Sequence, residues 1–108
     1  MTSYIKGLFY EFLSIICLFF KGHKILAWRY KTPVGEIDII SYRRNVIFVH
    51  EVKFRKKLDD AYAIINKKLE TRLTRTYYWW IKTNPKFAHC TIQIKYIFWH
   101  NKFMVKYL

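Results

Sequence analysis

Two strand-like segments joined by a short polar turn constrain the fold of this chain more than any other feature. Residues 36–41 (EIDIIS) and 46–54 (VIFVHEVKF) are rich in Ile, Val and Phe, which favour β-strands. Between them, Asn45 is a residue that tolerates a positive φ, so Arg44 and Asn45 are the expected loop of an antiparallel hairpin. A sheet built on this hairpin is therefore the predicted framework of the fold.

The segments on either side of the hairpin supply the remaining elements. Residues 4–21 predict an apolar helix that ends at Gly22. Residues 60–82 repeat apolar side chains at three- and four-residue steps, with Asp59 and Asp60 as the N-cap pair of a second helix. Other strand-like segments are 24–30, 89–99 and 102–108, the last as an edge strand or a frayed end. The order αβββαβ predicts a single α+β domain over residues 1–108, with a mixed sheet flanked by helices.

The net charge of the chain indicates which classes of partner it can bind. Lys and Arg number 20 against 7 Asp and Glu, which gives a formal net charge of +13. A field of this strength attracts polyanions. Nucleic acid is the commonest such partner and an anionic membrane surface is the alternative, and the excess of basic residues alone does not separate the two.

Neither the apolar N-terminal segment nor the cysteines indicate secretion. Residues 12–20 (FLSIICLFF) are too few to span a bilayer, and no small-residue cleavage site follows them. We therefore expect a buried helix and no stable membrane insertion. Cys17 and Cys90 have neither CxxC spacing nor a His at zinc-ligand distance, which predicts two reduced thiols in a cytoplasmic protein.

Three of the seven acidic residues of the chain lie in the hairpin. A loop at Arg44 and Asn45 places Asp38 opposite Glu51, where Cβ atoms of facing residues are about 5 Å apart. Because side chains alternate along a strand, Lys53 shares a face with Glu51, and Glu36 shares it with Asp38. The opposite face, which packs on a helix, is predicted to hold Ile37, Ile39, Phe48, His50 and Val52.

Two facing carboxylates repel each other and destabilise a hairpin unless a cation lies between them. Hard oxygen ligands with room for water favour Mg²⁺ or Mn²⁺, held by Asp38 and Glu51, over zinc. Such an ion lowers the pKa of a bound water and neutralises charge that develops on phosphoryl oxygens. Lys53 would position or deprotonate the attacking water, or stabilise that charge. The pattern predicts phosphodiester hydrolysis, and its alternative is an exposed salt-bridge cluster.

The spacing of these residues resembles a known nuclease signature. Asp38, followed thirteen positions later by the segment 51–53 (EVK), is similar to the restriction-endonuclease-like pattern of an Asp before Glu-x-Lys on adjacent strands. More narrowly, GEIDII with FVHEVKFR resembles the YraN family of small bacterial proteins, predicted nucleases distantly similar to Holliday-junction resolvases. The likeness covers residues 7–55, and Gln93 departs from it because the family pattern has an aspartate there.

This resemblance implies a restriction-endonuclease-like fold and hydrolysis of DNA, with branched or junction DNA as a candidate substrate. It also implies catalytic residues Asp38, Glu51 and Lys53, assisted by Glu11 and Glu36. Whether the protein assembles as a homodimer is left open.

Basic residues after the third strand and in the second helix predict contacts to phosphates, which position nucleic acid without reading its sequence. They are Arg55, Lys56, Lys57, Lys67, Lys68, Arg72 and Arg75. The aromatic segment 77–80 (YYWW) could stack on bases or seal a dimer, although we expect at least two of its residues in the core.

Two other function classes compete with the nuclease. One is a nucleic-acid-binding module of the same fold without turnover, which the departure at Gln93 favours. The other is a peripheral membrane protein anchored by the first helix, which requires residues 12–20 to be exposed.

Overall fold

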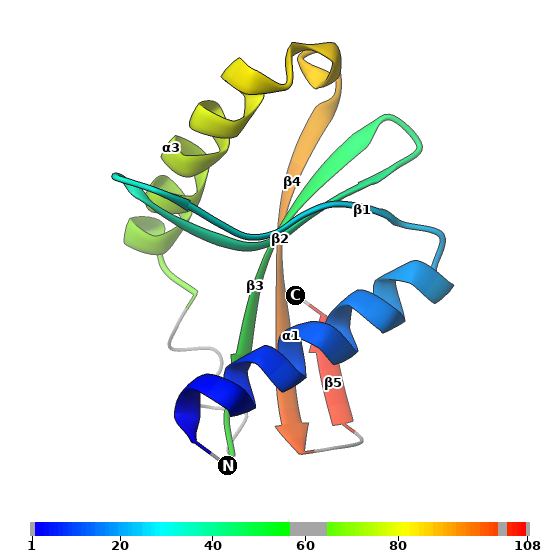
Figure 1. Ribbon diagram of the computed structural model, residues 1–108, viewed down its shortest axis with the longest axis vertical. Coiled ribbons are helices and arrows are strands. Elements are labelled where there is room, and N and C mark those ends of the chain that lie inside the picture. The colour runs from blue at the N-terminus through cyan, green and yellow to red at the C-terminus, as the bar shows by residue number, and fades with distance from the viewer. Residues whose placement is uncertain (1, 57–64, 102–103, 108) are drawn as a thin grey trace.

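The computed structural model describes residues 2–56, 65–101 and 104–107. Its elements are α1 (Ser3–Phe20), β1 (Lys24–Thr32), β2 (Gly35–Arg43), β3 (Val46–Phe54), α3 (Lys67–Thr83), the short 3₁₀ helix η1 (Pro85–Phe87), β4 (Thr91–Asn101) and β5 (Met104–Tyr107). The protein is an α+β fold in which helices flank a mixed sheet, as predicted (Figure 1).

The sheet has the strand order β1-β2-β3-β4-β5, in which β3 and β4 are parallel and the other neighbours are antiparallel. A parallel pair needs a long crossover, and the segment that contains α3 supplies it. The predicted hairpin register is confirmed, because Ile39 faces His50 and Arg43 faces Val46. Its loop residues, Arg44 and Asn45, have φ angles of 50° and 64°, as a two-residue hairpin turn requires.

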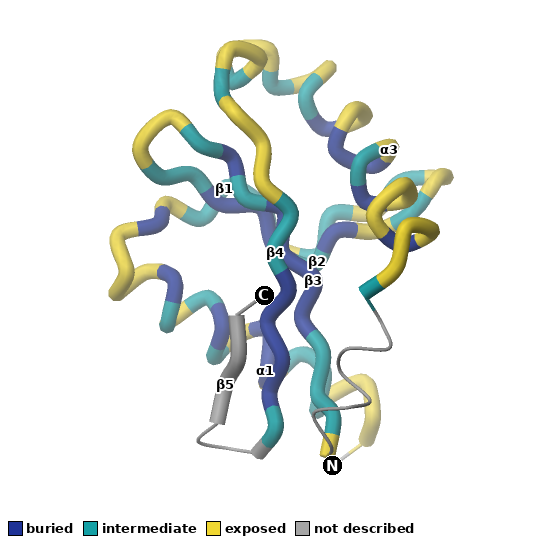
Figure 2. Tube along the Cα trace, turned by 180° about the vertical axis from the view of Figure 1, so that it is seen from behind, coloured by how far each residue is buried: buried dark blue, intermediate teal, exposed yellow. Residues whose placement is uncertain are grey.

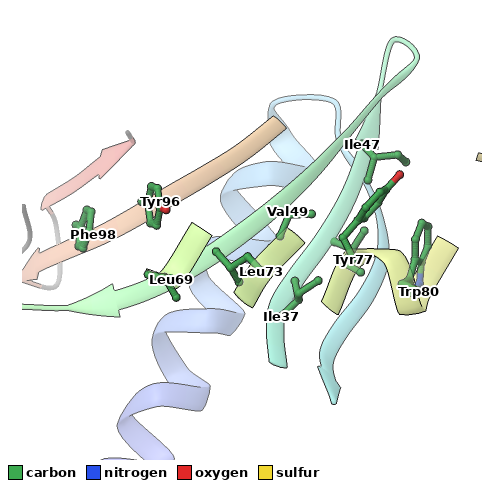
Figure 3. Close-up of a cluster of buried hydrophobic side chains, with 10 residues drawn as sticks. Ile37, Ile47, Val49, Leu69, Leu73, Tyr77, Trp80, Tyr96 and Phe98 are labelled. Carbon is green, nitrogen blue, oxygen red and sulfur yellow. The ribbon is translucent and has the colours of Figure 1, made fainter. Parts of the chain in front are cut away.

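The two helices cover opposite faces of this sheet. Alternation along β4 shows the division, because Tyr96 and Phe98 belong to the core cluster under α3, whereas Ile97 and Trp99 belong to the cluster under α1. The α3 cluster is shown in Figure 3 and includes Ile37, Ile47, Val49, Leu69, Leu73, Tyr77 and Trp80. The central parts of β2, β3 and β4 are consequently buried on both faces (Figure 2).

The structure corrects one predicted side-chain direction in β2. Ile39 and Val52 pack in the α1 cluster as predicted, but Ile37 packs in the α3 cluster. The alternation is interrupted beside Arg29 of β1, which adopts a φ of 58° between the pairs that Trp28 and Tyr30 make with Ile39 and Ile37. A left-handed residue in one strand rotates the local strand direction, so simple alternation fails there.

The second helix begins later than predicted. Residues 65 and 66 are not helical, and Asn66 is the N-cap of α3, with its side-chain oxygen accepting a hydrogen bond from the N–H of Leu69 at 2.9 Å. The predicted N-cap pair, Asp59 and Asp60, lies outside the described residues. Within α3, Tyr77 and Trp80 are buried whereas Tyr78 and Trp79 are exposed, in keeping with a core role for two of these aromatic residues.

The first helix is only partly buried, which corrects the expectation of a buried helix. Its sheet-facing residues are Tyr10, Glu11, Ser14 and Leu18. Ser14 fixes this face, because its Oγ accepts a hydrogen bond from Nε1 of Trp99 at 2.8 Å. The opposite side of α1 is exposed.

Candidate functional site

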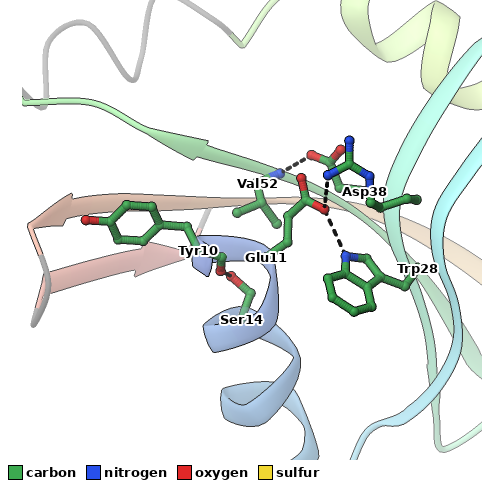
Figure 4. Close-up of polar contacts among 7 residues, drawn as sticks. Tyr10, Glu11, Ser14, Trp28, Asp38 and Val52 are labelled. Atoms are coloured by element: carbon green, nitrogen blue, oxygen red, sulfur yellow. Dashed lines mark hydrogen bonds and ion pairs between the residues drawn. The ribbon is translucent and has the colours of Figure 1, made fainter. Parts of the chain in front are cut away.

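The predicted carboxylates meet where the pairing of β2 and β3 ends. Ladder pairing stops at Ile39 and His50, and the next residue of β2, Asp38, accepts a hydrogen bond through Oδ2 from the backbone N–H of Val52 at 2.8 Å (Figure 4). This bond holds the Asp38 carboxylate beside Glu51. Both carboxylates line one cavity of about 250 Å³, whose other lining residues are Gly35, Glu36, Lys53 and Arg72. The four charged residues predicted to converge do so.

Asp38 is held in an unfavourable electrostatic environment. Burial raises the pKa of its carboxyl, as do the negative charges of Glu51 and, to a smaller extent, Glu11. The hydrogen bond from Val52 and the charge of Lys53 oppose this rise, and the resulting pKa of Asp38 is about 7. A native state that tolerates such repulsion without an obvious structural benefit is typical of functional sites.

Lys53 is tied to the second carboxylate of the cavity. Its Nζ lies 3.1 Å from Oε1 of Glu51, and its side chain stays about a third exposed. Glu51 itself is buried. The ion pair therefore joins a buried carboxylate to an ammonium that keeps partial access to solvent.

Glu11 approaches the same region from α1. Its Oε1 accepts a hydrogen bond from Nε1 of Trp28 at 2.8 Å and lies 3.5 Å from Nη1 of Arg29 (Figure 4). Glu11 does not line the cavity, but its charge contributes to the raised pKa of Asp38. Trp28 and Arg29 were not predicted as site residues. Side chains of consecutive strand residues normally point to opposite faces. Trp28 and Arg29 both reach the Glu11 carboxylate because Arg29 has a positive φ, and no neighbouring residue type indicates this φ.

Glu36 and Gly35 form the other end of the cavity. Glu36 is exposed and lines it, in line with the predicted shared patch. Gly35 lies against α3 so closely that a Cβ at its position would be 2.7 Å from Oγ1 of Thr76 and 2.8 Å from Cγ of Arg72. The absence of a side chain at residue 35 thus allows α3 to bring Arg72 to the cavity.

We expect Gly35→Ala to lower the free energy of unfolding by about 2–3 kcal/mol, because overpacking against α3 adds to strain at a φ of 156°. Urea denaturation measures this change. Gly7→Ala is the matched control, since a Cβ at residue 7 in α1 has nothing within 4 Å. The control should be neutral or stabilising by up to about 1 kcal/mol. Equal losses in the two variants would contradict the close packing of Gly35 on α3.

A larger basic groove adjoins the carboxylate cavity. It measures about 950 Å³ and shares Glu51, Lys53 and Arg72 with the smaller cavity. Five of the predicted phosphate-contacting residues line it: Arg55, Lys67, Lys68, Arg72 and Arg75. Lys56 is exposed but does not line the groove, and Lys57 lies outside the described residues.

The donor set of the cavity fits a hard divalent cation. Within the described ranges, no three side chains of His, Cys, Asp or Glu form a group that could hold a metal ion. Mg²⁺ retains several waters and is commonly held by one or two carboxylates, so Asp38 and Glu51 suffice for it. Protein zinc sites are mostly built from Cys and His ligands, which do not line this cavity.

A buried polar chain on the α1 side of the sheet was not predicted. Oγ of Ser41 lies 2.9 Å from Nδ1 of His23 and 2.8 Å from Nε2 of His50. Burial, followed by the charges of His23 and Lys95, lowers the pKa of His50 to about 3, so this residue is neutral at physiological pH. His50 is an interior residue as expected, and His23, which lies directly before β1, is buried as well.

The residue that departs from the family pattern lies away from the carboxylates. Gln93 is exposed on β4 and faces Phe48, three residues before Tyr96, which faces Glu51. It lines neither the cavity nor the groove. The substitution therefore leaves the carboxylate cluster intact.

Comparison with known proteins identifies relatives of the chain. Residues 10–98 match the profile of the uncharacterised protein family UPF0102. A UPF0102 protein of Rhodopseudomonas palustris (strain HaA2) is 35% identical over 89% of this chain and 73% of its own length. A UPF0102 protein of Nitrobacter winogradskyi is 34% identical over 89% of this chain and 80% of its own length. UPF0102 is the YraN family, so these matches confirm the family resemblance that the hairpin motifs indicated.

Proposed function

The chain belongs to the protein family UPF0102, and we propose that it is a metal-dependent nuclease that hydrolyses DNA phosphodiester bonds with Mg²⁺ or Mn²⁺. One observation carries the proposal: Asp38, Glu51 and Lys53 converge on a cavity that shares lining residues with an adjoining groove of basic residues. The recessed carboxylates supply a cation site, and the groove supplies contacts for a polyanionic backbone.

Each residue of the cavity has a distinct chemical task. Asp38 and Glu51 would hold the cation, which supplies a water of lowered pKa and neutralises charge on the phosphoryl group. The N–H of Val52 keeps the Asp38 carboxylate oriented through the 2.8 Å hydrogen bond. Lys53, held by Glu51 at 3.1 Å, presents Nζ to donate a hydrogen bond to the attacking water or to a phosphoryl oxygen.

Arg72 links the two parts of the site, because it lines both the cavity and the groove. A phosphate bound to its guanidinium would lie next to the carboxylate cluster, and the remaining groove cations would hold the flanking phosphates. Such contacts position a strand for cleavage without selecting its sequence.

Cleavage of labelled DNA tests the proposal. We expect the purified protein to cut at least one of three substrates, duplex, single-stranded or four-way-junction DNA, with Mn²⁺ or Mg²⁺ but not with a chelator. Binding of all three without any metal-dependent cutting would instead support the alternative, a nucleic-acid-binding module with the same fold. The sequence feature that suggested this alternative, Gln93, lines neither the cavity nor the groove.

The groove makes its own prediction for DNA affinity. Replacing Arg72 and Arg75 together with glutamine should weaken DNA binding roughly tenfold and lower the slope of log affinity against log salt by about 2, because two phosphate contacts are lost. Lys82→Gln is the control, since Lys82 is exposed on the same helix and does not line the groove. Fluorescence anisotropy with a chelator present measures binding without cleavage. An equal effect of Lys82→Gln would refute the groove as the binding surface.

A further inference from the structure

Helix α1 presents a continuous row of large apolar side chains to solvent. The row runs along one side of the helix at alternating steps of three and four residues, which places its members on a single face. It consists of Ile5, Phe9, Phe12, Ile16 and Phe19, with Phe20 beside the last. Phe12 is 50% exposed, Phe19 67% and Phe20 81%. Such a row far exceeds the scattered apolar residues of an ordinary protein surface.

The row is a surface of the folded domain and does not arise from a detached helix. Only 22% of the residues of α1 are buried, yet its inner face is fixed to the sheet by hydrogen bonds from Trp99 to Ser14 and from Trp28 to Glu11. Among the helices of the described residues, α1 is the one whose length and apolar composition would allow it to cross a membrane. Crossing would require these contacts to break, whereas contact along the outer face would leave them intact.

Trp28 extends the apolar row onto β1. Its side chain is exposed, and its ring centroid lies 6.4 Å from that of Phe12. Its Nε1 hydrogen is already donated to Glu11, so the exposed part of the ring is apolar. Amphipathic aromatic residues of this kind are enriched at the interface between lipid and water.

The charges around the row match an anionic surface. The one acidic residue of α1, Glu11, is buried against the sheet, so the outer side of the helix carries no carboxylate. Lys21 and Lys24 are exposed where α1 leads into β1. Basic residues beside an apolar helix face are attracted to anionic lipid headgroups.

Other occupants fit the row less well. An 18-residue helix is about 27 Å long, so a strip about 10 Å wide covers roughly 270 Å², well below the roughly 800 Å² that each partner of a stable dimer buries. Two copies would also bring together formal charges of +13 each. Nucleic acid would need hydrogen-bond donors for its phosphates, which Ile and Phe side chains lack.

We propose that α1 docks the protein in the plane of an anionic lipid bilayer, with Phe12, Phe19 and Phe20 entering the headgroup region and Lys21 and Lys24 contacting acidic headgroups. The groove lies on the α3 side of the sheet, so docking through α1 leaves it free. The inference is independent of the nuclease proposal.

Vesicle sedimentation tests the docking surface. Without DNA or metal, the full chain should bind vesicles of phosphatidylglycerol mixed with phosphatidylcholine, bind pure phosphatidylcholine far more weakly, and be released from the mixed vesicles in part by salt. Replacing Phe19 and Phe20 together with serine should lower the partition coefficient at least about tenfold. The matched control replaces the exposed α3 pair Tyr78 and Trp79 with serine and should bind as the wild type does.

Two further measurements make the outcome decisive. Because Phe19 and Phe20 are exposed, the double variant should keep the melting temperature of the wild type, so lost binding reflects the surface and not unfolding. Asp38→Asn should bind vesicles normally, which separates docking from the nuclease proposal. Absence of binding to anionic vesicles overturns the inference. The inference is also overturned if the wild type is a dimer that the Phe19 and Phe20 replacements dissociate. It is likewise overturned if those replacements lower the affinity for DNA.

Discussion

Asp38→Asn is expected to stabilise the metal-free protein at pH 8 by about 2–4 kcal/mol while abolishing DNA cleavage. Burial and the charge of Glu51 raise the pKa of Asp38 from 3.8 to about 7, and each unit of pKa shift corresponds to about 1.4 kcal/mol. Asparagine removes the charge and keeps an oxygen that can accept the hydrogen bond from Val52. A gain in stability with a loss of activity is the signature of a strained functional carboxylate.

The pH dependence of this gain follows from the sign of the pKa shift. A raised pKa in the folded state means that ionisation disfavours folding, so the cost is absent below pH 3.8, grows between pH 3.8 and about 7, and is complete above pH 7. The difference in unfolding free energy between Asp38→Asn and the wild type should therefore grow from pH 5 to pH 8. Urea denaturation at these two pH values measures it. A constant difference, or destabilisation at pH 8, would contradict the assigned environment of Asp38.

Glu51→Gln is the control that identifies the source of the strain. Repulsion between the carboxylates disappears when either one is neutralised, so the effects of Asp38→Asn and Glu51→Gln on the free energy of unfolding should not be additive in the double variant. Divalent ions provide a second check. Mn²⁺ should raise the melting temperature of the wild type, because it binds the native state, and should leave that of Asp38→Asn unchanged. Full additivity would show that the two carboxylates do not share one site.

The hairpin could be predicted because its determinants are local. Arg44 and Asn45 set the loop, the loop sets the register, and the register places Asp38 beside Glu51. The same local logic placed Lys53 next to Glu51. These steps require only the two-residue period of a strand and the preferences of turn residues, which short segments carry without tertiary context.

Features that depend on tertiary contacts could not be predicted in the same way. Ile37 packs on the α3 side of the sheet and not on the predicted α1 side, because Arg29 on the neighbouring strand has a positive φ. Such a φ is uncommon for a non-glycine residue and could not be predicted from the sequence. The apolar composition of α1 indicated burial, but one sheet can cover only one side of a helix, and all four of its Phe side chains lie on the exposed side. The basic residues of α3 were identified by composition, whereas their meeting with the cavity depends on the close contact of Gly35 with Arg72.

Lys53→Met is expected to lower the rate of DNA cleavage by roughly 10²- to 10⁴-fold, the range for loss of a group that assists proton transfer or stabilises developing charge. Methionine keeps much of the aliphatic length of lysine and removes the ammonium that lies 3.1 Å from Glu51. Cleavage rates at saturating Mn²⁺ and DNA measure the effect. The control is Lys82→Met, which removes an exposed charge of α3 outside the groove and should cut at the wild-type rate.

Stability measurements separate a chemical role of Lys53 from a structural one. The charge of Lys53 lowers the pKa of Asp38, so Lys53→Met should raise that pKa further and strengthen the repulsion within the metal-free cavity. A divalent cation relieves this repulsion, so the rise in melting temperature that Mn²⁺ causes should be retained or enlarged in Lys53→Met even though cleavage is lost. If the variant lost both the response to Mn²⁺ and cleavage, Lys53 would act by maintaining the cation site. If it cut DNA at the wild-type rate, the ammonium would have no part in the reaction, and the carboxylates alone would have to account for it.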